Sequence, residues 1–423
     1  MSQVSSPARI RVAMIGGGIN SAIGRVHEIA MKMDGRFELV AGCFSRDPEI
    51  NRQSAAQYGV AADRVHASAA ALLDQEAGQI DAVVVATPIQ SHFEQIAAAL
   101  DRGLRVISDK PLVGNPDECA ELRRRAQATG AEIYCIFNYT GYPAVREMRH
   151  RIRSGGIGKV FKVMAEMPQD SYMRLLNQGR VSAIQEWRLR DDEVACVTQD
   201  LFVHLHSLVS FVCGGRPDEV TAWARAISGV APGLIDEVDA IVRYDSGMVM
   251  NAWYGKVALG YRNGLRLRIF GTQGSLQWHQ EDPEHLIATD GEGNRLLLDR
   301  IAGGSEITAA PRYQRFKAGH PSGFIEAFAN YYFDIADSIE TGEQSPWLLP
   351  MASVEEGLRV SAAIHQSAAT QSAQRIALSS MNRLAERSAS AEIFALPLAT
   401  TRHRKGLGDP LSADAGLLQT LVH

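Results

Sequence analysis

Segments typical of strands and of helices alternate over the first 136 residues, and this alternation constrains the fold more than any other feature. The strand-like segments are short and apolar, and they cover residues 11–15, 37–44, 81–86, 104–107 and 132–136. The helix-like segments cover residues 23–33, 48–58, 91–102 and 116–129. Strands and helices in this order build a parallel sheet with helices on both faces. We therefore predict an α/β domain at residues 1–136.

A glycine-rich turn, Gly16-Gly17-Gly18, joins the first predicted strand to the first predicted helix. At such a turn the backbone N–H groups and the helix N-terminus can bind a pyrophosphate, which is the Rossmann arrangement for dinucleotides. Ser21 stands where the motif would have its third small residue, so we take Gly24 as the end of a motif lengthened by three residues. An ordinary glycine-rich turn is the alternative. The residues expected to contact the cofactor here are Gly16, Gly18, Ile19, Asn20 and Ile23.

The choice between NAD and NADP is expected to depend on the end of the second strand, where an acidic residue usually binds the adenosine ribose. In this chain Ser45 takes that position and Arg46 follows it. A small hydroxyl followed by a guanidinium suits a 2′-phosphate, because arginine binds phosphate well. In the alternative, Arg46 stacks on the adenine and Asp47 reaches the ribose. We favour NADP over NAD.

Polar residues directly follow three of the predicted strands, as Thr87-Pro88, Asp109-Lys110 and Asn138-Tyr139. Ligands of parallel α/β sheets bind beyond the carboxyl ends of the strands, so these three clusters are expected to border one site.

Lys110 is expected to act together with Asp200 and His204, which lie about ninety residues further along the chain. The latter two are four residues apart, which places both on one face of a helix. Together the three side chains can supply a positive anchor, an orienting group and a proton carrier. The alternatives are a solvated lysine at a turn and a core histidine held by a backbone carbonyl. Asp200 argues against the second, because a carboxylate can fix the imidazole tautomer and support its charged form. His206 has no such neighbour and is expected to be structural.

After residue 136 the pattern changes to longer strands and fewer helices. Strands are predicted at residues 160–167, 220–226, 238–244, 248–254, 265–270 and 275–278, and helices at residues 321–341 and 353–371. We expect an α+β domain at residues 137–378 with a large, mostly antiparallel open sheet that carries helices on one face. Trp253 and Tyr254 are expected on the other face, where a second subunit would pack to give a homodimer or homotetramer. Residues 379–423 lose clear periodicity, and we interpret them as a C-terminal tail or an intersubunit arm.

The composition is that of a chain with substantial cores: 46% of its 423 residues are hydrophobic and 22% are charged. A formal net charge of −5 and the lack of a long basic stripe argue against a nucleic-acid partner. The start of the chain lacks the apolar run of a signal peptide, and no segment is long enough to span a membrane. Five cysteines without paired short spacing argue against a disulfide framework and a metal site, so we expect a cytoplasmic protein.

Several separate motifs are spread over residues 9–375. They are the glycine turn, Ala86-Thr87-Pro88 with His92, Asp109-Lys110-Pro111, Asn138-Tyr139, residues 155–159, Trp187-Arg188, Asp200 with His204, and Gly319-His320-Pro321. Together they resemble the Gfo/Idh/MocA family of nicotinamide-dependent enzymes, which includes glucose-fructose oxidoreductase and inositol dehydrogenase. Asp109, Ile89 and Phe202 stand where this family usually has Glu, Asn and Gly.

The resemblance implies that Lys110, Asp200 and His204 carry catalysis. It implies a cofactor site that also includes Ser45, Arg46, Thr87, Pro88, His92, Asp109 and Lys110. It implies a substrate site bordered by Asn138, Tyr139, Gln169, Asp170, Trp187 and Arg188. For the last four of these residues, a surface loop with an ion pair is the alternative.

The activity implied is reversible oxidation of a secondary alcohol in a sugar, a sugar derivative or a cyclitol. His204 would take the hydroxyl proton while hydride leaves the same carbon for the nicotinamide. Asp200 would orient the imidazole, and Lys110 would hold and polarise the oxygen. One alternative is an elimination, glycoside cleavage or epimerisation that uses a tightly bound NAD(H) transiently. A second alternative is a dinucleotide-binding sensor without catalysis.

Overall fold

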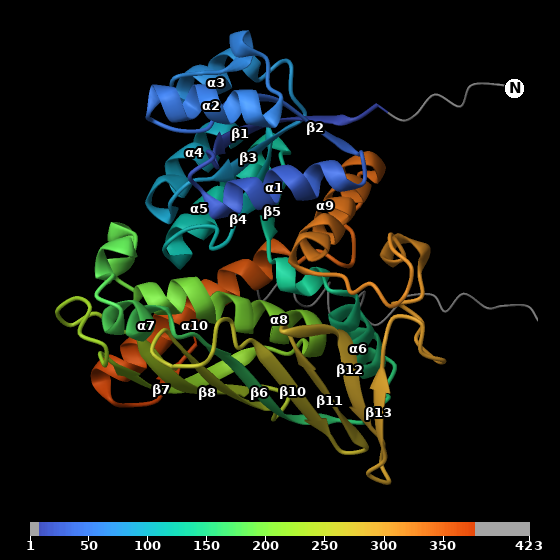
Figure 1. Ribbon diagram of the computed structural model, residues 1–423. Coiled ribbons are helices and arrows are strands. Elements are labelled where there is room, and N and C mark those ends of the chain that lie inside the picture. The colour runs from blue at the N-terminus through green and yellow to red at the C-terminus, as the bar shows by residue number, and fades with distance from the viewer. Residues whose placement is uncertain (1–7, 377–423) are drawn as a thin grey trace, which may run out of the picture. The chain divides into compact units, whose positions relative to one another are not determined.

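The computed structural model describes residues 8–376, and its first β-sheet is parallel (Figure 1). The strand order is β2-β1-β3-β4-β5. These strands are β1 (Ile10–Gly16), β2 (Phe37–Cys43), β3 (Ala82–Ala86), β4 (Arg105–Asp109) and β5 (Ile133–Ile136). Every residue of β3 is buried, as expected for a central strand of a sheet that is covered on both faces. The predicted Rossmann sheet is confirmed.

The helices between these strands are α1 (Ala22–Met33), α2 (Pro48–Tyr58), α3 (Ala69–Glu76), α4 (His92–Leu100) and α5 (Pro116–Thr129). Local sequence signals set their ends. The Asp47 carboxylate accepts hydrogen bonds from the N–H groups of Glu49 and Ile50, and so caps α2. Gly59 ends the same helix in the left-handed conformation. The helix α3 is additional to the predicted ones.

The glycine turn between β1 and α1 depends on close backbone packing. Gly16 and Gly17 have φ angles of +79° and +70°. A Cβ on Gly24 would lie only 2.1 Å from the carbonyl oxygen of Gly17, so α1 can approach the turn only because residue 24 is glycine. Ser21 caps α1 by accepting a hydrogen bond from the N–H of Gly24. Gly24 is therefore the closely packed glycine of the lengthened motif.

The second sheet has the strand order β13-β12-β11-β10-β6-β9-β8-β7-β14 and is antiparallel except for the β6–β9 pair. Its strands are β6 (Val160–Pro168), β7 (Pro217–Arg225), β8 (Glu237–Tyr244), β9 (Val249–Gly255), β10 (Arg266–Gly271), β11 (Gly274–His279), β12 (Asp282–Thr289), β13 (Arg295–Leu298) and β14 (Gln374–Arg375). The mostly antiparallel open sheet is confirmed, and β12, β13 and β14 are additional to the predicted strands.

Helices cover one face of the second sheet. The helices α6 (Pro143–Arg153), α8 (Val203–Cys213) and α10 (Met351–Thr370) pack against its strands (Figure 1). The helix α7 (Ser171–Asn177) follows β6, and α9 (Phe324–Thr341) packs against α1. His27 of α1 and Tyr332 of α9 are 2.8 Å apart, Nδ1 to Oη. The Rossmann part and the second part of the chain are thus held together by direct contacts.

The opposite face of the second sheet is open. Trp223 projects from it and is 53% exposed, and the half-buried Trp253 lies on the same face. Tyr254 does not lie there, because it is buried on the helix-covered face, where its hydroxyl is 2.9 Å from that of Thr198. The expected placement of Tyr254 on the open face is therefore wrong, since neighbouring residues of a strand point to opposite faces.

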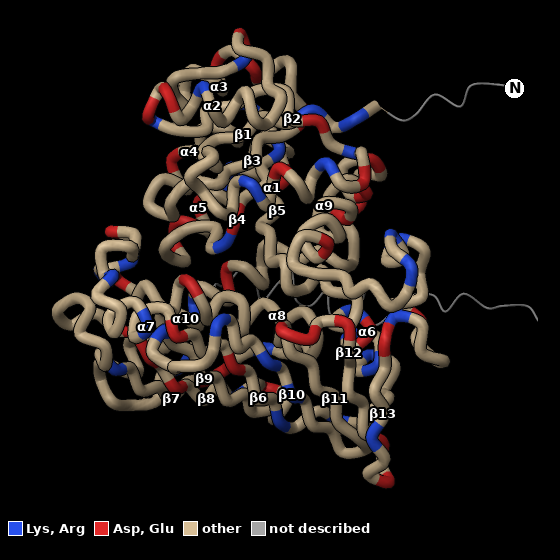
Figure 2. The backbone as a smooth tube through the Cα atoms, viewed as in Figure 1, with Lys and Arg blue, Asp and Glu red and all other residues tan. Residues whose placement is uncertain are grey.

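The predicted tail at residues 379–423 lies outside the described residues, and the domain boundaries at 136 and 378 stay predictions. Within residues 8–376, no helix combines the length and the hydropathy needed to cross a membrane. The same residues contain no cluster of three or more His, Cys, Asp or Glu side chains that could hold a metal ion. Figure 2 shows basic and acidic residues interspersed over both sheets and their helices.

Candidate active site

The candidate active site begins at the carboxyl end of β4, where Lys110 contacts Asp200. The ammonium group of Lys110 donates hydrogen bonds to the backbone carbonyl of Asp200 at 2.7 Å and to its carboxylate Oδ1 at 2.9 Å. The preceding residue, Asp109, lies with Oδ1 3.5 Å from Nε2 of His27. Lys110 and Asp200 therefore lie together, as their positions in the sequence predict.

The Asp200 carboxylate has two further cationic partners. Lys256 Nζ lies 2.7 Å from its Oδ2, and the guanidinium of Arg188 forms an ion pair with the same oxygen. Burial alone would raise the pKa of the Asp200 carboxyl, but the charges of the three cations outweigh burial and hold that pKa well below its usual value. Asp200 is therefore an ionised anchor for three cations.

Lys256 is a further residue of the site and is not among those predicted from the sequence. It directly follows β9, which runs parallel to β6 with Gly255 opposite Pro168. This register brings Lys256 beside Gln169, whose Oε1 is 3.3 Å from the ammonium nitrogen. Burial lowers the pKa of the Lys256 ammonium, and the neighbouring Asp200 charge opposes this effect. A charged residue at a strand end was the signal for Lys110, and the same signal could have found Lys256.

His204 lies in the first turn of α8, directly after a π-helical turn at Thr198–Phe202. Its side chain is buried, and its ring packs edge-on against Tyr139 with a centroid distance of 4.7 Å. Burial lowers the pKa of His204 well below its ordinary value, and the charge of Lys110 lowers it further. The imidazole is therefore neutral over most of the pH range in which proteins are stable.

The expected hydrogen bond between Asp200 and the His204 ring is not present. Nδ1 of His204 has no hydrogen-bond partner among residues 8–376. Residues four apart share one face of an α-helix, but the i→i+5 bonding of a π turn widens the turn that carries Asp200. The carboxylate is instead occupied by its cationic partners. Asp200 acts on His204 only through its charge, which partly opposes the lowering of the histidine pKa.

A network of amides and one phenol lies next to this cluster. Asn263 donates to the Tyr139 hydroxyl at 3.0 Å and to Gln280 at 3.1 Å, and it accepts from Gln169 at 3.1 Å. Asn138, which precedes Tyr139 in the sequence, is buried, and its Nδ2 has no hydrogen-bond partner within the described residues. Asn263 and Gln280 are further residues that the sequence does not reveal, because they follow no predicted strand that ends at the site.

The remaining residues predicted for the substrate site have different surroundings. The guanidinium of Arg188 stacks on the ring of Trp187, 4.3 Å from its centroid, and belongs to the site through Asp200. Asp170 is buried, and its carboxylate is used by Arg174 at 3.0 Å and by Arg262 at 2.9 Å. Asp170 therefore fixes the segment after β6, and a contact with substrate stays a prediction for it and for Trp187.

At the glycine turn, some backbone donors are used within the protein and others are free. The N–H groups of Gly18 and Ile19 bond the Phe44 carbonyl at 3.1 Å and the Ser54 hydroxyl at 3.0 Å. The N–H groups of Asn20 and Ile23 have no partner within residues 8–376. The turn and the first turn of α1 can therefore donate to an anion such as a pyrophosphate.

His92 holds two strand-end loops together. Its Nε2 is 2.8 Å from the carbonyl oxygen of Thr87, and its Nδ1 is 3.1 Å from those of Pro111 and Leu112. The Thr87 side chain donates to Gln95 at 2.7 Å, and Pro88 leads into a 3₁₀ turn at Ile89–Ser91. His92 thus positions the loops that carry the predicted cofactor residues, and its direct contact with the cofactor stays a prediction.

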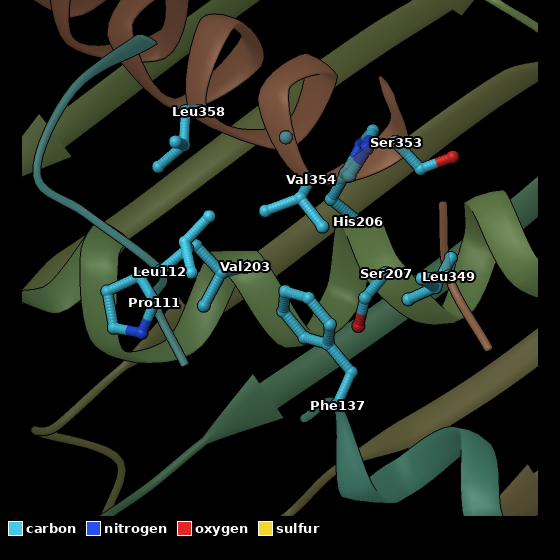
Figure 3. Close-up of a pocket in the computed structure, with 11 residues that line it drawn as sticks. Pro111, Leu112, Phe137, Val203, His206, Ser207, Leu349, Ser353, Val354 and Leu358 are labelled. Atoms are coloured by element: carbon cyan, nitrogen blue, oxygen red, sulfur yellow. The ribbon is translucent and has the colours of Figure 1, made fainter. Parts of the chain in front are cut away.

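The neighbouring histidine of α8, His206, faces away from this site. Figure 3 shows its ring beside Ser353 and Val354 of α10. These residues, with Pro111 and Phe137, line a cavity of about 10 Å³. A cavity of this volume holds about one water molecule and no substrate. Burial lowers the pKa of His206 to about 4. Its Nε2 lies 3.5 Å from Oε1 of Glu356, so the expectation that His206 has no carboxylate neighbour is wrong. A structural role for His206 stays a prediction.

Sequence comparison finds two matching families within the chain. Residues 10–137 match the family described as "Oxidoreductase family, NAD-binding Rossmann fold", and residues 145–277 match the family described as "GFO/IDH/MocA C-terminal domain". Inositol 2-dehydrogenase of Rhizobium meliloti is 25% identical over 344 residues, which is 79% of this chain and 90% of that protein.

Solved structures of similar proteins cover most of the chain. An oxidoreductase of Sinorhizobium meliloti is 32% identical with a TM-score of 0.77, and the match covers 87% of this chain and 99% of that one. An inositol dehydrogenase homologue of Azotobacter vinelandii, solved with NADH and myo-inositol, is 29% identical with a TM-score of 0.79. The match covers 87% of this chain and 98% of the homologue's chain.

Proposed function

Because this chain belongs to the Gfo/Idh/MocA family of NAD-binding oxidoreductases, we propose that it transfers hydride reversibly between a nicotinamide and a secondary alcohol or ketone. The substrate is a sugar, a sugar derivative or a cyclitol. The observation that carries the proposal is the contact of Lys110 with Asp200, with His204 one turn further on, at the carboxyl edge of the Rossmann sheet. In open α/β sheets this edge is where ligands bind.

The glycine turn fits a dinucleotide. Its free N–H groups at Asn20 and Ile23 and the N-terminus of α1 suit a pyrophosphate, and a Cβ on Gly18 would lie 3.0 Å from the Phe44 carbonyl oxygen. When bound, the nicotinamide supplies the hydride acceptor or donor.

The side chains of this protein handle the proton and the oxygen. Lys110 has one N–H beyond those it gives to Asp200, and this group donates to the substrate oxygen. His204 is neutral and accepts the hydroxyl proton. The excess of positive charge around Asp200 stabilises negative charge on the oxygen as that proton leaves. Asp200 is thus a positioning residue that holds the cations in place.

The amide network supports a substrate with several hydroxyl groups. Asn138 has an unpartnered buried amide, and Asn263 and Gln169 present further donors and acceptors beside Tyr139. The homologue from Azotobacter vinelandii was solved with myo-inositol, which is a compound of this kind.

The test is an assay of the purified protein with NAD⁺ and NADP⁺ against a panel of sugars, sugar acids and cyclitols. Absorbance of the reduced nicotinamide measures net hydride transfer, and chromatography detects altered sugars. Net reduction of the cofactor supports the proposal. A converted sugar with an unchanged, retained cofactor would instead indicate transient redox chemistry. Tight dinucleotide binding without any conversion would indicate a sensor.

For the cofactor we propose NADP. Asp47 is committed to capping α2, and Ser45 accepts the Asp47 N–H at 3.1 Å, while Arg46 is exposed. No acidic side chain is thereby left to pair with the ribose at this strand end, and Arg46 is free to bind a 2′-phosphate.

The variant Ser45→Asp tests this cofactor assignment, because it places a carboxylate against the 2′-phosphate. The ratio of the NADP to NAD dissociation constants should rise by a factor on the order of 10–100. Wild-type protein that binds NAD more tightly than NADP, or a ratio that the substitution does not change, contradicts the assignment.

We propose further that the open face of the second sheet joins subunits into a homodimer or homotetramer. The exposed Trp223 and the half-buried Trp253 on this face support the proposal, since large aromatic side chains on one face of a sheet are typical of interaction surfaces. We assign the protein to the cytoplasm, and the five cysteines support this because all of them are unpaired.

A further inference from the structure

Several cations share a single carboxylate at the candidate active site. The cations are Lys110, Lys256 and Arg188, and the carboxylate is that of Asp200. Within residues 8–376, none of these cations forms an ion pair with a second carboxylate. The whole chain has a formal net charge of −5, so the positive excess is a local property of the site.

Other acidic groups on the neighbouring segments are already occupied. Asp170 is paired with Arg174 and Arg262. Asp191 accepts hydrogen bonds from the N–H groups of Cys196 and Ile235. Asp191 thus has no cationic partner in the described part of the chain but is bound by backbone donors, and Asp109, which precedes Lys110, lies 3.5 Å from His27. The hydroxyls of Tyr139 and Tyr172 and the thiol of Cys196 add no negative charge, because burial raises their pKa values. Within residues 8–376, Asp200 is therefore the one carboxylate in ion-pair contact with Lys110, Lys256 and Arg188.

Water can compensate little of the positive charge of Lys256, because this side chain is buried. Its side chain is 5% exposed, and a buried ammonium is unfavourable unless an anion compensates for the lost hydration. It uses two of its three N–H groups, on Asp200 and Gln169. Arg188 uses two of its five N–H groups, on Asp200 and Gln185. Both residues contact the same oxygen of Asp200, so their unused donors lie close together.

We propose that the substrate is a polyhydroxy acid whose carboxylate binds the unused N–H groups of Lys256 and Arg188. Its reacting hydroxyl then lies at Lys110 and His204, so the inference rests on the hydride-transfer function proposed above. A carboxylate suits this position because its two oxygens match the N–H groups of a guanidinium, with an ammonium beside them. One bound carboxylate also leaves enough positive charge to stabilise the oxygen that loses its proton.

The first experiment compares matched acid and neutral ligands on the wild-type enzyme. Calorimetry measures binding of D-glucuronate against D-glucose, D-galacturonate against D-galactose, and a hexose phosphate, all to the enzyme saturated with reduced cofactor. The uronates should bind on the order of 10–100-fold more tightly than the neutral sugars, and added salt should reduce this advantage. Uronates that bind no more tightly than their neutral partners overturn the proposal, and so does a preference for the hexose phosphate.

Turnover is measured with the same compounds, so that the two proposals can fail separately. Hydride transfer from neutral sugars without any preference for acids contradicts the substrate class and leaves the proposed function intact. Tight uronate binding without any hydride transfer sustains the acid site and contradicts the proposed function.

The second experiment uses Lys256→Met, which removes the ammonium and keeps most of the apolar stem. The ratio of acid to neutral affinity should fall on the order of 10–100-fold. Lys256→Arg should retain much of the preference, and Lys159→Met, at an exposed lysine, should leave the ratio unchanged. Circular dichroism and dinucleotide affinity confirm that each variant is folded. A folded Lys256→Met with the wild-type ratio overturns the proposal, and if this variant does not fold, the wild-type comparison decides.

Discussion

Asp200 holds three cations in place, which differs from the role that its spacing to His204 indicates. Its carboxylate is occupied by Lys110, Lys256 and Arg188, and the His204 ring lacks that support. Burial and the charge of Lys110 keep the imidazole neutral. A neutral imidazole can accept a proton from an alcohol without first losing one, so the arrangement remains suited to a general base.

The substitution Asp200→Asn should destabilise the fold and shift the pH profile. Removing the carboxylate leaves buried cations without an anion, which costs on the order of 3–5 kcal/mol of unfolding free energy. The Asp200 charge raises the His204 pKa, so its loss lowers that pKa further. The acidic limb of kcat/KM should therefore move to lower pH. Chemical unfolding and a pH–rate profile measure the two effects.

A matched control is Asp74→Asn, which removes an exposed carboxylate paired with Arg102. Surface pairs of this kind contribute about 0–1 kcal/mol, so this variant should resemble the wild type. An Asp200→Asn protein of wild-type stability, or an acidic limb that moves to higher pH, would contradict the role assigned to Asp200.

At the residue scale, the sequence predicts those site residues that follow strands or share helical spacing. Lys110 and Asp200 were predicted together and lie in contact. Lys256 and Asn263 come from segments whose approach to the site depends on the parallel pairing of β6 with β9 and on a loop conformation. Lys256 directly follows a predicted strand, as Lys110 does, whereas no local signal in the sequence marks Asn263. The π turn was also unpredictable, because no residue type marks it, and it removed the expected hydrogen bond.

At the scale of elements, α8 separates two histidines with opposite surroundings. His204 faces the candidate site beside Tyr139, and His206 packs between α8 and α10 against Gly357. A Cβ on Gly357 would lie 2.7 Å from the His206 ring, so the two helices approach closely at this point. His206 is thus part of the packing that holds the site against α10.

The packing of His206 predicts a dependence of stability on pH. Its folded pKa of about 4 is below the ordinary histidine value, so between these two pH values the folded state binds fewer protons than the unfolded state. The contribution of His206 to the unfolding free energy is therefore fully present above about pH 6.5. As the pH falls from there to 4, this contribution decreases by about 1.4 kcal/mol per pH unit. The buried His204 contributes in the same direction.

The variant His206→Gln lacks one of these titrations and should show a shallower loss of stability from pH 6.5 to 4. Urea unfolding at several pH values measures the slope, and a comparison at pH 8 corrects for the altered packing. Equal slopes for the variant and the wild type would mean that His206 does not resist protonation in the folded state.

Elements with strong local signals were predicted well. The strands of the Rossmann sheet are short apolar runs next to glycine, proline or capping residues, and their order along the chain leaves few possible topologies. The strands β12 and β13 show little apolar alternation, and β13 lies at the edge of the sheet, so the sequence does not indicate them. Their burial patterns contain a single buried residue each.

At the scale of the whole molecule, the site is assembled from both sheets. Lys110 follows β4 of the parallel sheet, and Lys256 follows β9 of the second sheet. The alternation of elements predicts each sheet separately, but only the packing of one part against the other brings these two lysines to Asp200. The open face of the second sheet is available to a further subunit.

The substitution Trp223→Glu tests that open face. Trp223 and Trp253 line a hollow of about 690 Å³ on this face, and a charge placed there opposes packing by a second apolar surface. The subunit dissociation constant should rise on the order of 30-fold or more. Light scattering over a dilution series measures it, with Ile301→Glu as a control at an exposed apolar residue in the turn after β13. An unchanged oligomer mass for Trp223→Glu would place the interface elsewhere.

The most direct test of the central claim is the turnover number of His204→Ala, measured beside its dinucleotide affinity. The claim is that Lys110 and His204 act on one hydroxyl next to the nicotinamide. We expect a loss in kcat of roughly 10²–10⁴ with dinucleotide affinity little changed, because the imidazole faces the substrate. Wild-type kcat in His204→Ala, on a substrate whose deuterium isotope effect shows that hydride transfer limits the rate, would contradict it and move the base to Lys110 or Tyr139.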